Sequence, residues 1–246
     1  MKIVAAIFIV CLLWSGAEAA ITFDAINTAD DNSGTASPSV NITVGGACTD
    51  RAIIVYVAWN HDLGLGSVSS MTIGGSSATF IGGVSPGSAS ISRRIEMWYR
   101  VGNATGSNTV TATMNGAKDA ITISARSYCG VHQTATLGTP ATADNDGANA
   151  LATVDVSSAG TELVVDAVMT SSTASLTVGA GQTQRNNDAT YVGVFLSGSS
   201  DETGAGTTTM SWTTATDDYT GIIAVPLRPA PTGGPSFVRR RVVTNQ

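Results

Sequence analysis

Charged residues are scarce in this chain. Asp, Glu, Lys and Arg make up 12% of the 246 residues, and the formal net charge is −6. Only two lysines occur, Lys2 and Lys118. Because nucleic-acid affinity comes largely from basic groups that neutralise phosphates, we do not expect the body of the protein to bind nucleic acid. The one basic cluster, Arg239 to Arg241, lies in the C-terminal tail.

Cysteines are also few, and the first of the three lies in a segment that resembles a targeting signal. The first twenty residues contain Lys2, an apolar run of about twelve residues that includes Cys11, and the triplet Ala17-Glu18-Ala19. The apolar run is too short to span a bilayer, which takes roughly twenty residues. We therefore predict a cleaved signal peptide over residues 1–20 and an extracellular or periplasmic protein with no membrane span. An uncleaved anchor helix is the alternative.

The remaining two cysteines, Cys48 and Cys129, predict one disulfide, as is usual for a pair in an exported chain. Cys48 precedes the apolar run 51–59, and Cys129 follows the run 119–128. If these runs are antiparallel neighbours, the start of one meets the end of the other. Cα atoms much more than about 7 Å apart would exclude the bond. Two separate buried thiols are the alternative.

Helical periodicity is absent beyond two turns after the signal. Short runs rich in Val, Ile and Thr alternate instead with Gly, Ser, Asn and Asp, which is typical of strands and turns. The run 51–59 is almost wholly apolar, so we expect a central strand covered on both faces. The expected strands of the first half are 51–59, 95–101, 108–114 and 119–128.

The second half repeats this order with runs 161–169, 189–198, 207–213 and 219–227. "MTIGG" (71–75) and "LTVGAG" (176–181) each fall between the first and second run of their half. We predict an all-β protein in which two related strand sets form one two-sheet antiparallel β-sandwich, jelly-roll-like or Ig-like, over residues 21–230. Residues 231–246 are expected to be a Pro/Gly-rich basic tail.

The order of these phrases resembles a recurrent β-sandwich module of bacterial secreted proteins and some phage-associated proteins. "ITFDAINT", "DRAIIVYVAW", "IEMWYRVGNATGSNTVTATM", "ARSYCGVHQTATLGT" and "GIIAVPLRPA" carry the resemblance, which covers roughly residues 20–230. It implies an extracellular β-sandwich. It supplies no catalytic residues to transfer to this chain.

The sequence contains few groups of residues that could form a metal site. The two histidines, His61 and His132, are distant in sequence, whereas a zinc site needs three or four converging ligands. Acidic residues cluster at 30–31, 144–146 and 217–218. Asp144 and Asp146 form the candidate calcium site, because calcium prefers carboxylate and amide oxygens. The alternative for each cluster is a solvated turn without a bound ion.

One strand carries a candidate ligand surface. Alternation along 95–101 places Glu96, Trp98 and Arg100 on the face opposite the core. A flat aromatic ring flanked by polar groups suits sugar binding. The alternative is that another strand covers Trp98. Asp166 is also expected to face outward.

These observations predict a secreted, non-enzymatic structural or interaction module with a surface, adhesive or assembly role, and no cofactor other than calcium. Its partners would be a polysaccharide, a cell-surface component or further copies of itself. A carbohydrate-binding module using Trp98 is the first alternative. An extracellular hydrolase of unrecognised type is the second, and it would need Glu96 or Asp166 beside a second carboxylate in a cleft.

Overall fold

The computed structural model describes residues 18–60, 66–87, 93–146, 150–171, 175–188 and 195–232. Within these ranges the chain forms seventeen strands and no helix, and all the pairings are antiparallel. The all-β antiparallel sandwich class is therefore confirmed. No helix in the described ranges is long and apolar enough to cross a membrane.

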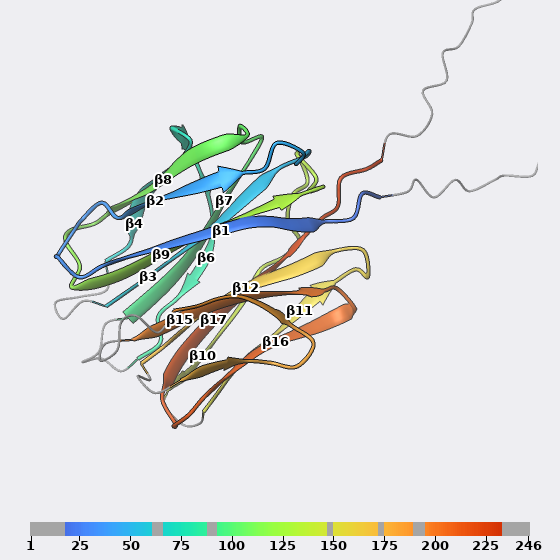
Figure 1. Ribbon diagram of the computed structural model, residues 1–246. Helices are drawn as coiled ribbons and strands as arrows, with labels where there is room; N and C mark the ends of the chain where they lie inside the picture. Colours follow the sequence, from blue (N-terminus) through green and yellow to red (C-terminus); the bar gives the residue numbers. More distant parts are fainter. Residues whose placement is uncertain are drawn as a thin grey trace, which may run out of the picture.

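The first half of the chain folds into a sandwich of its own, called here the first sandwich (Figure 1). Its five-stranded sheet has the order β1 (Thr22–Asp31), β9 (Ala120–Cys129), β3 (Ala52–Asn60), β7 (Arg93–Val101) and β6 (Thr79–Val84). Its four-stranded sheet has the order β2 (Ser39–Val44), β8 (Gly106–Met114), β4 (Val68–Ile73) and β5 (Ser76–Ser77).

The second half repeats this topology as the second sandwich. Its five-stranded sheet has the order β10 (Ala141–Asp146), β17 (Tyr219–Leu227), β12 (Leu163–Thr170), β15 (Leu196–Thr203) and β14 (Thr183–Asp188). A three-stranded sheet of β11 (Leu151–Ser158), β16 (Gly206–Thr214) and β13 (Leu176–Val178) covers it. Strands β10 to β17 take the positions of β1 to β4 and β6 to β9, while β5 has no counterpart in the described part of the second sandwich. The two strand sets are therefore related as predicted. "MTIGG" and "LTVGAG" supply the equivalent strands β4 and β13.

The number of sheets differs from the sequence-based expectation. Each half supplies both sheets of its own sandwich, rather than one sheet of a shared sandwich, and the two five-stranded sheets pack face to face. The molecule is thus a stack of four sheets, with three buried core layers. The middle layer includes Tyr56 and Met97 from the first sandwich and Met169 and Ile223 from the second.

The burial patterns explain this stack. Strands β3 and β12 are buried along almost their whole length, so they require cover on both faces and lie in the central sheets. Strands β2, β8, β11 and β16 alternate between buried and exposed residues, so they have one solvent face and lie in the outer sheets. A two-layer sandwich would leave one face of β3 in water.

The described ends of the chain lie together. Ala19 N donates to Ala230 O over 2.8 Å, and Glu18 forms a β-bridge with Pro231. The predicted signal peptide up to residue 17 and the tail from residue 233, including Arg239 to Arg241, lie outside the described residues.

Candidate functional site

Trp98 is buried, which corrects the expectation of an outward-facing aromatic. Strand β7 lies inside the five-stranded sheet, and its even-numbered face is covered by the four-stranded sheet. Trp98 is only 9% exposed and belongs to the core of the first sandwich. Glu96 is 2% exposed on the same face. Alternation along a strand separates its two faces, but it does not show whether the second face is covered.

Glu96 is held by two hydrogen-bond donors. Arg94 Nε donates to Glu96 Oε1 over 2.6 Å, and Trp98 Nε1 donates to Glu96 Oε2 over 3.2 Å. A buried carboxylate needs such donors to offset its lost hydration. Within this cluster Glu96 therefore satisfies the indole N–H and pairs with the arginine.

The second sandwich has the same arrangement on the opposite sheet. Its tryptophan, Trp212, lies on β16 of the three-stranded sheet, and Trp212 Nε1 donates to Asp166 Oδ2 on β12 over 2.8 Å. Gly198 leaves space for the Trp212 ring, since a Cβ there would lie 3.0 Å from the ring. Asp166 is fully buried, so its expected outward orientation is also wrong.

The surface part of the first tryptophan cluster is formed by Phe80. This residue lies on the edge strand β6, is 45% exposed, and packs edge-on against Trp98 with ring centroids 5.0 Å apart. Arg94 remains 25% exposed beside it and also donates to Ser85 Oγ over 3.1 Å. Phe80 was not among the residues predicted from the sequence, although it lies only five residues after the "MTIGG" segment (71–75).

Arg100 belongs to a turn rather than to the tryptophan cluster. Its Nη1 donates to Asn103 Oδ1 over 2.8 Å, and Asn103 Nδ2 donates back to the Arg100 carbonyl over 2.7 Å. The partly buried Arg51 also donates to the Asn103 carbonyl. These bonds fix the turn after β7.

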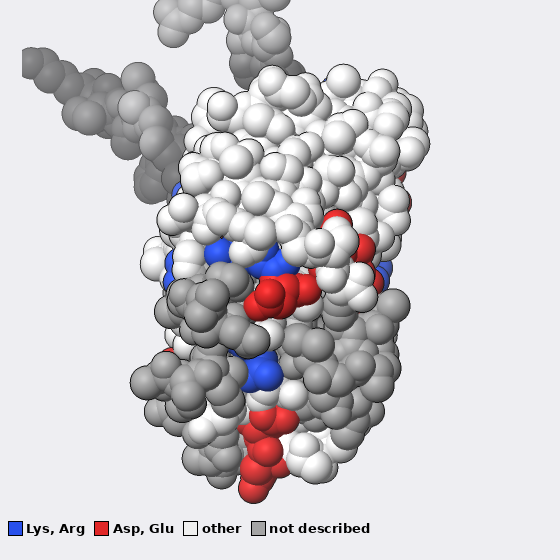
Figure 2. Space-filling model, turned by 90° about the vertical axis from the view of Figure 1, so that its left-hand side faces the viewer, with Lys and Arg blue, Asp and Glu red and all other residues white. Residues whose placement is uncertain are grey.

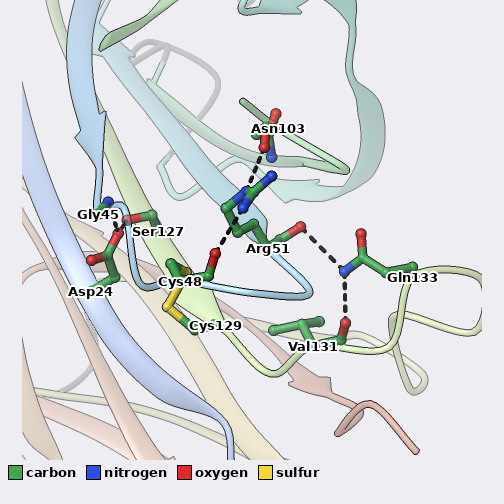
Figure 3. Close-up of a disulfide and its surroundings, with 9 residues drawn as sticks. All are labelled: Asp24, Gly45, Cys48, Arg51, Asn103, Ser127, Cys129, Val131 and Gln133. Carbon is green, nitrogen blue, oxygen red and sulfur yellow. Dashed lines mark hydrogen bonds between the residues drawn. A yellow bond between two sulfur atoms is a disulfide. The ribbon is translucent and has the colours of Figure 1, made fainter. Parts of the chain in front are cut away.

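The predicted disulfide between Cys48 and Cys129 is present, with Cα atoms 5.1 Å apart (Figure 3). Strands β3 and β9 are antiparallel neighbours, as the prediction required. Asp24 lies beside the bond and accepts from Gly45 N over 2.9 Å and from Ser127 Oγ over 2.6 Å. Asp24 and the two sulfurs lie close together, but sulfurs bonded to each other are not thiolate ligands for a metal.

The candidate calcium residues lie at the end of edge strand β10. Asp144 is opposite Gly221, and Asp146 is opposite Tyr219. Asp144 is exposed and, with Asn145, lines a hollow of about 180 Å³ next to β11. The Asp146 side chain lies outside the described part, so the calcium site stays a prediction. His132 Nδ1 accepts from Thr134 N and Ala135 N in a turn, and His61 lies outside the described residues.

A buried arginine joins the two sandwiches. The pairing of β12 with β15 is interrupted between Val165–Asp201 and Val168–Gly198. Arg126 of the first sandwich donates to two carbonyls in this gap, Asp166 O over 2.8 Å and Ser200 O over 3.2 Å. Arg126 therefore supplies donors that the interrupted ladder does not.

Asp166 connects the interrupted part of the β12–β15 pairing to the three-stranded outer sheet. Its Oδ1 accepts from Ser200 N over 2.6 Å, while Trp212 binds the other oxygen. Burial raises the pKa of Asp166 to about 6, although the donors Trp212 and Ser200 and the positive charge of Arg126 act in the opposite direction.

Tyrosines complete the polar part of the middle layer. Tyr128 donates to Asp201 Oδ2 over 3.2 Å, and Arg185 binds both oxygens of that carboxylate at 2.6 and 2.9 Å. Tyr56 lies within 3.2 Å of Ser197 Oγ and accepts from Asn186 Nδ2 over 2.7 Å. Burial raises the pKa of Tyr56 to about 12, so both tyrosines stay neutral donors or acceptors at ordinary pH.

The two outer sheets present hydroxyl groups to solvent. On the four-stranded sheet, Thr111 lies between Ser39 and Thr72 in one row across the strands. Its four strands contain no charged residue, and the upper part of the molecule in Figure 2 is correspondingly free of charge. On the three-stranded sheet, Thr207, Thr209 and Thr213 are exposed, and Thr209 Oγ1 donates to Asp155 over 2.6 Å.

The chain matches no family model, no curated protein and no solved structure. Arguments about function therefore depend on the geometry of this chain.

Proposed function

We propose that the protein is a secreted, non-enzymatic structural or interaction module with a surface, adhesive or assembly role. The resemblance to modules of bacterial secreted and phage-associated proteins and the predicted signal peptide favour a location outside the cytoplasm. The disulfide agrees with such an oxidising compartment. Polysaccharide, a cell-surface component or further copies of the protein are the partners we propose.

The observation that carries this proposal is the pair of hydroxyl-bearing sheets at opposite ends of the stack. The exposed residues of β2 and β8 include Asn41, Thr43, Thr109 and Thr113. Neighbouring strands lie about 4.8 Å apart and alternate residues about 6.7 Å apart, so the hydroxyls form a regular array. Such a neutral face can donate and accept hydrogen bonds without the desolvation cost of burying charges. The three-stranded face at the other end also presents hydroxyl groups, but it carries the exposed Asp155. Two hydroxyl-bearing faces, of which the four-stranded one is uncharged, would suit an element placed between partners.

Substitution on the four-stranded sheet tests the proposal. We expect the secreted protein to self-associate or to sediment with an insoluble polysaccharide or cell-envelope fraction. The double variant Thr109→Glu/Thr111→Glu should lose this association, because it places two unpaired charges in the contact. Sedimentation velocity and pull-down assays measure the two forms of association.

A matched control adds the same charge elsewhere. Asn32→Glu/Thr105→Glu alters two exposed positions in turns and should associate like the unchanged protein. An unchanged protein that associates with none of these materials would contradict the proposal. Equal loss of association in both double variants would show that net charge, not the hydroxyl face, is responsible.

Carbohydrate binding is the second candidate, and the exposed ring of Phe80 favours it. Phe80 packs edge-on against Trp98, and the indole of Trp98 is linked through Glu96 to the partly exposed Arg94, which gives an apolar surface with a polar group in the same cluster. Trp98→Ala is a poor test because Trp98 is part of the core. Phe80→Ala should instead abolish binding in a glycan screen. Leu151→Ala, at an equally exposed apolar residue of the second sandwich (46%), is the control and should leave binding unchanged.

A further inference from the structure

The disulfide of the first sandwich lies beside a carboxylate. One carboxylate oxygen of Asp24 and the sulfurs of Cys48 and Cys129 all lie within 4.8 Å of one another, and Figure 3 shows the Asp24 side chain next to the bonded sulfurs. Asp24 comes from β1, Cys129 from the end of β9 and Cys48 from the turn before β3. Among the described residues, no other group of three or more His, Cys, Asp or Glu side chains is this compact. The fold therefore gathers three groups that, as two thiolates and a carboxylate, are metal ligands.

Asp24 is held in place through only one of its two oxygens. Gly45 N donates to Asp24 Oδ2 over 2.9 Å, and Ser127 Oγ donates to the same oxygen over 2.6 Å. Oδ1 accepts no hydrogen bond from any described residue. A Cβ at position 45 would lie 2.5 Å from Oδ1, so the glycine keeps room at this oxygen. Outer hydrogen bonds of this kind orient carboxylates that bind metals.

The three side chains are accessible from a hollow on the surface. Asp24, Cys48 and Cys129 line a hollow of about 510 Å³ together with the turn residues 45–49. Cys48 is buried, whereas Asp24 and Cys129 are partly exposed. Ala19 and Ala20 also line the hollow and belong to the predicted signal peptide, so cleavage after residue 20 would widen it. A reductant or a metal ion can therefore reach the sulfurs from this side.

From this geometry we propose that reduction of the Cys48–Cys129 bond creates a metal site in which both thiolates and Asp24 bind Zn²⁺, with the fourth position open to water. This metal site goes beyond the structural or interaction role proposed above. It belongs to the reduced protein, before the disulfide forms or after a dithiol has broken it. The oxidised protein has no thiolates and therefore no such site.

A dithiol reductant balances the reaction. By thiol–disulfide exchange the dithiol supplies two electrons and two protons, the bond between Cys48 and Cys129 breaks, and each sulfur becomes a thiol. The reductant becomes a disulfide. Zn²⁺ then replaces the two thiol protons, which are released to water.

The dimensions of the site suit zinc. Zn–S bonds of about 2.3 Å in a tetrahedral arrangement hold two sulfurs about 3.8 Å apart, so the sulfurs must separate after reduction. The Cα atoms are 5.1 Å apart and Cys48 lies in a turn rather than in a strand, so side-chain rotation can supply this separation. Thiolates also favour zinc over calcium or magnesium.

The charge of the site also suits zinc. The three anionic ligands exceed the charge of Zn²⁺ by one. The guanidinium of Arg51 lies close by, since its Nη1 donates to Cys48 O over 2.7 Å, and its positive charge offsets this excess.

Cobalt and zinc binding to the reduced protein test the proposal. The full protein is reduced with dithiothreitol, freed of the reductant under argon and titrated with Co²⁺. We expect a sulfur-to-cobalt charge-transfer band that saturates at one equivalent and disappears when Zn²⁺ is added. Zn²⁺ should also raise the thermal midpoint of the reduced protein but not that of the oxidised protein, because the unfolded chain does not hold the three ligands together.

A variant of Asp24 tests its role as a ligand. Asp24→Asn keeps an oxygen that accepts from Gly45 and Ser127, so it should retain the fold while it loses the charged ligand. Competition with a chromogenic chelator should show at least about tenfold weaker Zn²⁺ binding, since loss of a residue that only orients a ligand already costs that much. Asp50→Asn, at an exposed aspartate two residues after Cys48, is the control and should bind Zn²⁺ like the unchanged protein.

Four results would overturn the proposal. A reduced protein that gives no charge-transfer band, or a Cys48→Ala/Cys129→Ala variant that still gives one, would show that the two sulfurs do not bind the metal. Equal zinc affinity of Asp24→Asn and the unchanged protein would exclude Asp24 as a ligand. Equally weakened binding in Asp24→Asn and Asp50→Asn would show that general negative charge attracts the metal. An equal rise of the midpoint in the oxidised protein would place the zinc elsewhere.

Discussion

At the scale of single residues, two of the buried tryptophans, Trp98 and Trp212, explain two of the buried carboxylates. Trp98 hydrogen-bonds to Glu96, and Trp212 hydrogen-bonds to Asp166. Trp98 lies in the five-stranded sheet of the first sandwich, whereas Trp212 lies in the three-stranded sheet of the second, where its ring fills the space that Gly198 leaves on the facing sheet. A buried indole N–H without an acceptor would be costly, and the nearby acidic residue supplies the acceptor.

This pairing leads to a prediction for Asp166. Asp166→Ala would leave Trp212 Nε1 and Ser200 N without their acceptors, at roughly 1–3 kcal/mol for each buried donor. We expect a large fall in the free energy of unfolding, measured by urea denaturation with tryptophan fluorescence. Asp144→Ala, at an exposed aspartate, is the control and should change stability by less than about 0.5 kcal/mol. Similar stabilities of the two variants would contradict this role.

At the scale of strands, the disulfide fixes the pairing of β3 with β9. The bond closes a loop of 81 residues that contains most of the first sandwich. In the chain-entropy model, a loop of this length stabilises the folded state by about 4–5 kcal/mol, which is an upper estimate. We expect Cys48→Ala/Cys129→Ala to lower the thermal midpoint by many degrees, measured by calorimetry.

The control for the disulfide is chemical reduction. Reduction of the unchanged protein should lower the midpoint about as far as the double substitution, and the reductant should leave the double variant unchanged. An oxidised protein no more stable than the double variant would show that the bond does not constrain the unfolded chain.

Much of the strand order could be predicted from the sequence, because the order of apolar and polar residues along a strand indicates whether one or both of its faces are covered. The continuous apolar run of β3 and the strand expected over 108–114, which is part of β8, were both recognised. Residues 189–194 of the predicted run 189–198 lie outside the described residues. Strand β15 spans Leu196–Thr203, and the prediction did not extend to residues 199–203 because the Ser, Gly and Asp residues of this strand do not resemble a core strand. Those small polar residues are buried because they face Trp212 and the middle layer.

The count of sheets and the candidate site were harder to predict. A strand buried on both faces cannot exist in a two-layer sandwich, so the β3 run already implied more layers than two. The outward orientation of Trp98 could not be corrected from its own strand, because its cover comes from the other sheet of the sandwich, whose strand β4 contacts β7.

At the scale of the whole molecule, Arg126 links the two sandwiches through its hydrogen bonds and through the effect of its charge on Asp166. Arg126→Met would leave the carbonyls of Asp166 and Ser200 without donors, at roughly 1–3 kcal/mol each. It would also remove the positive charge that lowers the pKa of Asp166, so that pKa would rise further above 6. A folded-state pKa raised above the unfolded value makes stability fall with pH, and a larger rise extends this fall to higher pH.

We therefore expect Arg126→Met to be more destabilising at pH 8 than at pH 5, measured by urea denaturation at both values. Arg100→Met, at a partly exposed arginine near the end of β7 that binds the following turn, is the control and should show a smaller loss that is equal at the two pH values. If Arg126→Met cost the same at both pH values, Arg126 would act only through its hydrogen bonds. If it cost nothing, the apolar middle layer and the hydrogen bonds of Tyr56 and Tyr128 would hold the two sandwiches together without Arg126.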